Sequence, residues 1–144
     1  KLIIEPTELL KKVPFFKDIP ENEFKASASC MKQRLFSEGE FIIYQGEAGN
    51  SLFLIARGVV RVSREENGTK RDLATLFAGD FFGEMALLHN EPRSASIQAI
   101  TSCTLYELSR YDLNRFVDFH PRIREALKEA DQKRRSSIFL TENL

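Results

Sequence analysis

Short apolar runs, separated by turn residues, fill the middle of this 144-residue chain. Several of them alternate apolar with polar positions, which is typical of β-strands with one buried face. Val60 and Val62 alternate with Arg61 and Ser63, and Leu105 alternates with Thr104 and Tyr106. The pattern predicts strands over Gln33–Phe36, Phe41–Tyr44, Ser51–Ala56, Val59–Glu65, Lys70–Leu76, Phe81–Phe82, Arg93–Ala99 and Cys103–Leu108.

Glycine marks the same region, because all seven glycines lie between positions 39 and 83. Helices tolerate glycine poorly, whereas short strands use it at turns and bulges. The Asn67-Gly68 pair between two of the runs is a strong hairpin signal. About eight short strands at this spacing predict an eight-stranded β-roll of the jelly-roll kind.

Both flanks have apolar residues at helical spacing instead. Helices are predicted over Thr7–Lys12 and Glu21–Met31 on the N-terminal side. After the strands, Ser109 followed by Asp112 resembles a capping box. The apolar face that follows consists of Leu113, Phe116 and Val117.

A last helix is predicted from Pro121, because proline fits the first helical position. Its apolar face continues at spacings of three and four through Ile123, Ala126, Leu127 and Ala130. We expect this helix to end at about Ser137. The fold class predicted is therefore mainly β with flanking helices.

The length favours a single domain over residues 1–144, because a chain of this size with 42% hydrophobic residues can bury one core but not two. We divide it into N-terminal helices (1–32), a β-roll (33–108), C-terminal helices (109–137) and a tail (138–144).

Charge and cysteine content limit the partners and the compartment. Basic and acidic residues both number 21, so no attraction to bulk nucleic acid or anionic membrane is expected. Cys30 and Cys103 are read as reduced packing residues of an intracellular protein. No apolar run is long enough to cross a bilayer, and residues 1–6 lack the apolar core expected of a signal peptide. We expect a cytoplasmic domain, and the lack of an initial Met suggests excision from a longer protein.

Catalysis is not expected. His89 and His120 are the two histidines, and neither has the spacing of a metal site. No nucleophile elbow or Walker loop is present. We therefore expect no enzyme, no metal and no cofactor.

The stretch from Phe82 to Ser96 carries the binding chemistry. A strand ends at Phe82, Gly83 allows a close backbone approach, and Glu84 to Leu88 can form one helical turn whose free N–H groups would bind an anion. Nine residues after Glu84, Arg93 can offer a fork of donors to the same anion. Glu84 accepts hydrogen bonds, so it suits a hydroxyl such as a ribose 2′-OH.

These residues resemble the phosphate-binding cassette of cyclic nucleotide-binding domains. The Phe-Gly-Glu sequence, the small and apolar turn and Arg93-Ser94-Ala95 follow one another as in that family. The resemblance extends to Gly39-Glu40, to the turn at 46–49, to Gly58 and to Gly79-Asp80.

The resemblance implies that the backbone of Gly83 and Ala86 and the side chain of Arg93 hold a cyclic phosphate, while Glu84 takes the ribose hydroxyl. It implies an apolar floor around the base, formed by Val62, Leu76, Phe82 and Met85. Ser94 would contact the phosphate or the 2-amino group of guanine, next to Ala95. Taken alone, Arg93 reads as a solvated arginine, Phe82 and Met85 as core residues, and Ser94 as facing a neighbouring strand.

The last helix offers a lid. Arg134 interrupts its apolar stripe before Ile138, and an arginine there can stack on a purine. The ion-channel members of the family carry an arginine at a matching distance after a pair represented here by His120-Pro121. The alternative is that Arg134 belongs to a solvated charge run with Lys133 and Arg135.

The resemblance implies a sensor of cAMP, or of cGMP, that regulates an attached effector by moving its C-terminal helix. The pore domain of a cyclic-nucleotide-gated channel, closest to prokaryotic-like channels, is our first expectation, with the parent protein in the plasma membrane and no membrane contact by this fragment. The alternative is a regulatory module of a cAMP-dependent kinase or another soluble effector. A complete transcription factor is not expected, because only residues 137–144 follow the last helix.

Overall fold

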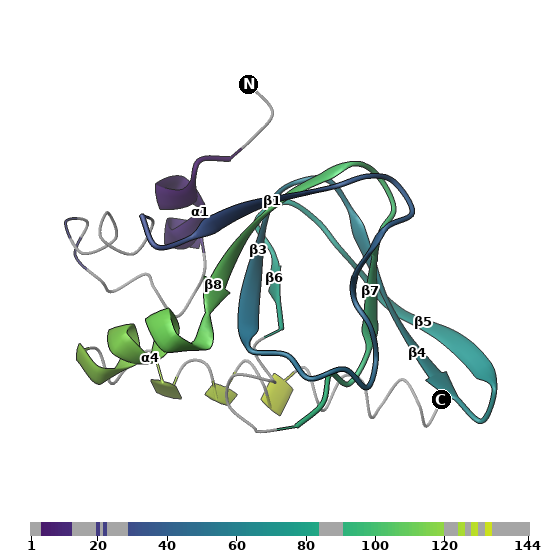
Figure 1. Cartoon of the computed structure of the whole chain (residues 1–144). Coiled ribbons are helices and arrows are strands. Elements are labelled where there is room, and N and C mark those ends of the chain that lie inside the picture. The colour runs from purple at the N-terminus through teal and green to yellow at the C-terminus, as the bar shows by residue number, and fades with distance from the viewer. Residues whose placement is uncertain are drawn as a thin grey trace.

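In the part of the chain that the structure describes, eight antiparallel strands form the body of the protein. They are β1 (Lys32–Phe36), β2 (Phe41–Ile43), β3 (Ser51–Arg57), β4 (Val60–Glu66), β5 (Thr69–Leu76), β6 (Phe81–Phe82), β7 (Ser96–Ala99) and β8 (Cys103–Ser109). The computed structural model describes residues 4–12, 20, 22, 29–83, 91–119, 124–125, 128–129 and 132–133. Two four-stranded sheets, with the orders β1-β8-β3-β6 and β2-β7-β4-β5, face each other as a β-roll (Figure 1). The predicted eight-stranded roll is confirmed.

The hairpin between β4 and β5 follows from its turn residues. Glu66 pairs with Thr69, and the two residues between them have positive φ angles of 53° at Asn67 and 79° at Gly68. Asparagine and glycine adopt this left-handed conformation at low cost, and it matches the twist of paired strands. The hairpin predicted from Asn67-Gly68 is confirmed.

The hydrophobic core lies between the inner faces of the two sheets. Alternation along each strand places every second side chain on this inner face. One sheet contributes Phe53, Ile55, Phe82, Cys103 and Leu105, and the other contributes Ile43, Val60, Ile97 and Ala99. The same alternation decides which residues of the candidate site share this face.

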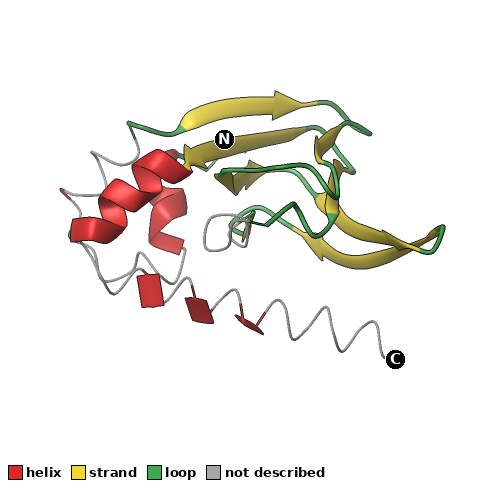
Figure 2. Cartoon of the chain, turned by 60° about the horizontal axis from the view of Figure 1, so that its bottom comes forward, coloured by secondary structure: helices red, strands yellow, loops and turns green. Residues whose placement is uncertain are grey.

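The outer face of the first sheet is also covered. Thr104 and Tyr106 in β8 are only 3% and 7% exposed, so the alternation expected there is wrong. β8 lies between β1 and β3 in this sheet. The helix α1 (Pro6–Lys12) contacts β3, and the helix α4 (Arg110–Phe119) contacts β8 (Figures 1 and 2). Ser63 is buried as well, because the register shifts between Val62 and Ser63.

The helix termini follow the sequence signals in part. The backbone N–H of Asp112 donates to Ser109 Oγ at 3.2 Å, which confirms the predicted start of α4. The helix predicted over Glu21–Met31 is wrong at its end: Ser29 and Cys30 form a turn and Met31 is irregular, because β1 begins at Lys32.

The remaining helical predictions lie largely beyond the described residues. Within the last helix, residues 124–125, 128–129 and 132–133 are helical, as expected. The cassette turn at 84–88 and the side chains of Leu113, Phe116 and Val117 are not described. In the described part of the chain, no helix is long and apolar enough to cross a membrane.

The two cysteines differ in environment. Cys103 is buried in the core, whereas Cys30 is exposed. The packing role is therefore right for Cys103 and wrong for Cys30, which lies in the turn before β1. Burial raises the pKa of the Cys103 thiol.

Candidate functional site

The described half of the candidate site lies where β6 ends and where the chain enters β7. Gly83 follows β6 directly, and Arg93 stands three residues before β7. The predicted strand Arg93–Ala99 is therefore too long at its start. The backbone of Arg93 pairs instead with the loop between β2 and β3: its N–H donates to Glu47 O, and its carbonyl accepts from Gly46 N, both at 2.8 Å. This pairing fixes the position from which the Arg93 side chain extends.

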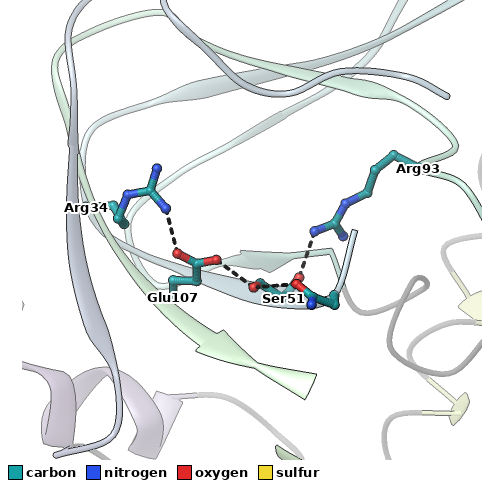
Figure 3. A network of polar contacts seen from close by, with 5 residues as sticks. Arg34, Ser51, Arg93 and Glu107 are labelled. Atoms are coloured by element: carbon teal, nitrogen blue, oxygen red, sulfur yellow. Dashed lines mark hydrogen bonds and ion pairs between the residues drawn. The ribbon is translucent and has the colours of Figure 1, made fainter. Parts of the chain in front are cut away.

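The guanidinium of Arg93 is held by two backbone carbonyls. Nη1 donates to Gly83 O and Nη2 donates to Ser51 O, each at 3.1 Å (Figure 3). Both acceptors are neutral carbonyl groups, and the two bonds orient the guanidinium. Arg93 is half-buried, which makes a solvated surface arginine the poorer description.

Two glycines make room for this guanidinium. A side chain at Gly49 would overlap Arg93, and a Cβ at Gly83 would lie 2.7 Å from Ser51 O and 2.9 Å from Arg93 Nη1. Gly83 also has a φ of 93°, a conformation that glycine adopts far more readily than other residues. The close approach predicted at Gly83 is thus present. Gly49 was not among the predicted site residues, although the turn at 46–49 was recognised.

The described residues of the predicted apolar floor come from both sheets, Val62 and Leu76 from the second and Phe82 from β6 of the first. Val62 and Leu76 are partly buried and pack against the core from the neighbouring strands β4 and β5. Ala74 pairs directly with Val62, and the sequence did not single it out. Phe82 is 2% exposed and stacks on Phe53 with 5.2 Å between ring centroids. Phe82 is therefore a core residue behind the site, the alternative that the sequence left open.

Ser94 is half-buried and Ala95 is buried, both next to Arg93 before β7 begins. Five predicted site residues lie outside the described residues, namely Glu84, Met85, Ala86, Arg134 and Ile138. Their roles therefore stay predictions. Among the described residues, no group of three or more His, Cys, Asp and Glu could hold a metal ion.

A chain of polar contacts that the sequence did not reveal leads to Arg93. Arg34 Nη1 donates to Glu107 Oε1 at 2.6 Å, and Ser51 Oγ donates to Glu107 Oε2 at 2.6 Å. Ser51 is the residue whose carbonyl accepts from Arg93 (Figure 3). Nothing in the sequence spacing links positions 34, 51, 93 and 107, because the contacts depend on the pairing of β1, β8 and β3.

Comparison with known proteins identifies the family. The family model described as "Cyclic nucleotide-binding domain" matches residues 33–120, which include strands β2 to β8, nearly all of β1, and Arg93 with the predicted cassette. This chain belongs to the cyclic nucleotide-binding domain family. It is therefore a cyclic nucleotide sensing domain, and a domain of this kind is regulatory and has no catalytic activity by itself.

Curated relatives of the domain have different names and lengths. The Cyclic AMP receptor protein of Thermus thermophilus is 39% identical over 72% of this chain and 48% of its own length. The cAMP-dependent protein kinase regulatory subunit of Mycosarcoma maydis is 36% identical over 64% of this chain and 18% of its own length. The potassium/sodium hyperpolarization-activated cyclic nucleotide-gated channel 2 of Mus musculus is 32% identical over 84% of this chain and 14% of its own length. This chain thus spans less than half of each relative.

Solved structures show the same roll. The catabolite activator protein of Thermus thermophilus has a TM-score of 0.80 at 34% identity, covering 90% of this chain and 62% of that chain. The regulatory domain of Toxoplasma gondii PKA, crystallised with cAMP, has a TM-score of 0.73 at 27% identity, covering 92% and 47%. The relatives include receptor, kinase and channel proteins, so they show the family of this domain and leave its effector open.

Proposed function

We propose that this domain senses cAMP, with cGMP as the alternative ligand, and that Arg93 binds the cyclic phosphate. The observation that carries the proposal is the guanidinium of Arg93, which two neutral carbonyls hold beside Gly83 at the start of the predicted cassette. An oriented guanidinium can give two parallel hydrogen bonds to phosphate oxygens, which a lysine cannot do. The relatives whose names or titles mention cAMP support this ligand.

In this proposal the other groups complete the site around the phosphate. Glu84 accepts the ribose hydroxyl, the backbone of Gly83 and Ala86 donates to the phosphate, and Val62, Leu76 and Met85 contact the base. The phosphate binds first, and the C-terminal helix then brings Arg134 and Ile138 over the base. Energy released by this closure shifts the equilibrium between two states of the attached effector.

The effector we propose is a channel pore domain. The alignment with the channel relative covers 84% of this chain, whereas those with the receptor protein and the kinase subunit cover 72% and 64%. The domain would then lie on the cytoplasmic side of a plasma-membrane protein. The alternative is the regulatory part of a kinase, which is favoured by a solved domain titled "Sp-2Cl-cAMPS bound to PKAR CBD2" that matches 96% of this chain and 89% of its own.

Titration calorimetry with cAMP and with cGMP tests the ligand. Replacing Arg93 with Leu removes charge-assisted hydrogen bonds worth about 1.5–3 kcal/mol, so Kd should rise about tenfold to 150-fold. Arg61→Leu is the matched control, because Arg61 points away from the inner face and pairs with Asp72 at 3.6 Å. A wild-type protein that binds neither nucleotide overturns the proposal, and so does an unchanged affinity of the Arg93→Leu variant.

The effector needs a separate test. A channel requires transmembrane segments in the parent protein, and a kinase regulator requires a second cassette or an inhibitory segment before this domain. The parent gene should therefore encode transmembrane segments upstream of residue 1. A parent gene without them contradicts the channel and leaves the ligand proposal standing.

A further inference from the structure

Inside the roll, a chain of polar groups reaches the phosphate-site arginine from the opposite edge of the first sheet. Arg34, Glu107 and Ser51 lie on the inner face of β1, β8 and β3, as do their strand neighbours Leu105 and Phe53 in the core. We call these three residues the inner polar chain. Its last member, Ser51, is 4% exposed and accepts a hydrogen bond from Arg93 through its carbonyl (Figure 3).

Ser51 connects two parts of the site that do not touch. Its hydroxyl has one proton, which goes to Glu107 Oε2 at 2.6 Å, because the other acceptor, Asn50 Oδ1, is 3.5 Å away. Its carbonyl accepts from Arg93 Nη2 at 3.1 Å. The side-chain bond fixes Ser51 at the start of β3, and the carbonyl of the same residue then fixes one arm of the guanidinium.

A carboxylate on the inner face would repel a bound phosphate unless a cation balances it. The side chain of Glu107 is 22% exposed, so water screens its charge only in part. Arg34 Nη1 lies 2.6 Å from Glu107 Oε1 and supplies the balancing charge. The Arg34–Glu107 pair therefore has no net charge. Glu107 provides a strong acceptor for the Ser51 hydroxyl, and Arg34 cancels the repulsion between the Glu107 carboxylate and the phosphate of the ligand.

From these contacts we propose that Ser51 and Glu107 are positioning residues, which hold Arg93 in the orientation that binds the cyclic phosphate. They touch no ligand in this proposal and act only through Arg93. The inference rests on the proposed role of Arg93. It adds the residues that restrict the Arg93 side chain to the rotamer in which the guanidinium can reach the phosphate.

The test is a double-mutant cycle on cAMP affinity, measured by calorimetry. Ser51→Ala removes the hydroxyl, and we expect Kd to rise about threefold to tenfold, the effect of one hydrogen bond. Ser51→Thr keeps a hydroxyl on the same carbon and should restore most of the affinity. Glu107→Ala should weaken binding to a similar extent, and its effect should not add to that of Ser51→Ala.

The same substitution in an Arg93→Leu background separates positioning from mere stability. Without a guanidinium there is nothing to orient, so Ser51→Ala should then leave Kd unchanged within about twofold. Thr104→Val is the matched control, because Thr104 also carries a buried hydroxyl group but lies on the outer face of β8, away from Arg93. The Thr104→Val variant should bind cAMP with the Kd of the wild type. Thermal melting of each variant shows that the folded protein is being titrated.

Three results would overturn the inference. An unchanged Kd for Ser51→Ala, with Arg93→Leu still weakening binding, contradicts the positioning role and leaves the proposed function intact. Independent, additive losses from Ser51→Ala and Arg93→Leu also contradict it. Absence of nucleotide binding by the wild-type protein overturns the proposed function, and the inference fails with it.

Discussion

Replacing Gly49 with Ala should damage nucleotide binding more than folding. The added methyl group would overlap the guanidinium of Arg93, which is the far end of a flexible side chain and can move away. Gly49 is not among the residues with positive φ, so alanine fits its backbone without strain. The substitution therefore acts by displacing Arg93.

The structure gives the size of each effect. Displacement breaks the hydrogen bonds of Arg93 to Gly83 O and Ser51 O, at about 0.5–1.5 kcal/mol each. Replacing glycine by alanine returns about 0.4–1 kcal/mol by restricting the unfolded chain. The net loss of unfolding free energy should thus be at most about 2.6 kcal/mol. The loss of a charge-assisted contact to phosphate should raise Kd for cAMP at least about tenfold.

Urea denaturation measures the first quantity and titration calorimetry the second. Gly83→Ala is the comparison, because the new methyl group would meet the backbone oxygen of Ser51 at 2.7 Å and the φ of 93° is strained for alanine. That variant should lose more stability than Gly49→Ala. Wild-type affinity of Gly49→Ala would refute the reasoning, as would an equal loss from Gly49→Ala in an Arg93→Leu background, where no guanidinium remains to be displaced.

Two further predictions concern the base and the lid. Ser94→Ala should weaken cGMP binding by about 0.5–1.5 kcal/mol more than cAMP binding, because one hydrogen bond to the guanine amino group is lost. Calorimetry with both nucleotides checks it, and equal losses would place the hydroxyl elsewhere. A chain ending before Leu127 should keep the β-roll by circular dichroism but bind cAMP more weakly. A fully unfolded product, or unchanged affinity, would count against the lid.

Signals that act over a few residues were sufficient to predict most of the fold. The Asn67-Gly68 turn and the Ser109 cap of α4 depend on nearby residues and on backbone conformation. The strand pattern was equally local, and its errors concern ends and burial. Thr104 looks solvent-facing in the sequence, but β8 is a central strand covered on its outer side.

The support of Arg93 could not be predicted, because it depends on register between distant strands. Ser51 and Glu107 meet only because Ser51 pairs with Ser109 and Phe53 pairs with Glu107 in the β3–β8 ladder. Arg34, Ser51 and Glu107 lie on three different strands, β1, β3 and β8, and their spacing in the sequence forms no recognisable motif. Gly49 was visible as a turn glycine, but its contact with Arg93 required the position of the β2–β3 loop.

A crystal structure of this domain with cAMP tests the central claim most directly. The account predicts a phosphate oxygen within about 3 Å of a guanidinium nitrogen of Arg93, which is the range of a charge-assisted hydrogen bond. It also predicts that Nη2 still donates to the carbonyl of Ser51. A nucleotide bound elsewhere, with the Arg93 guanidinium directed to bulk water, would contradict the account.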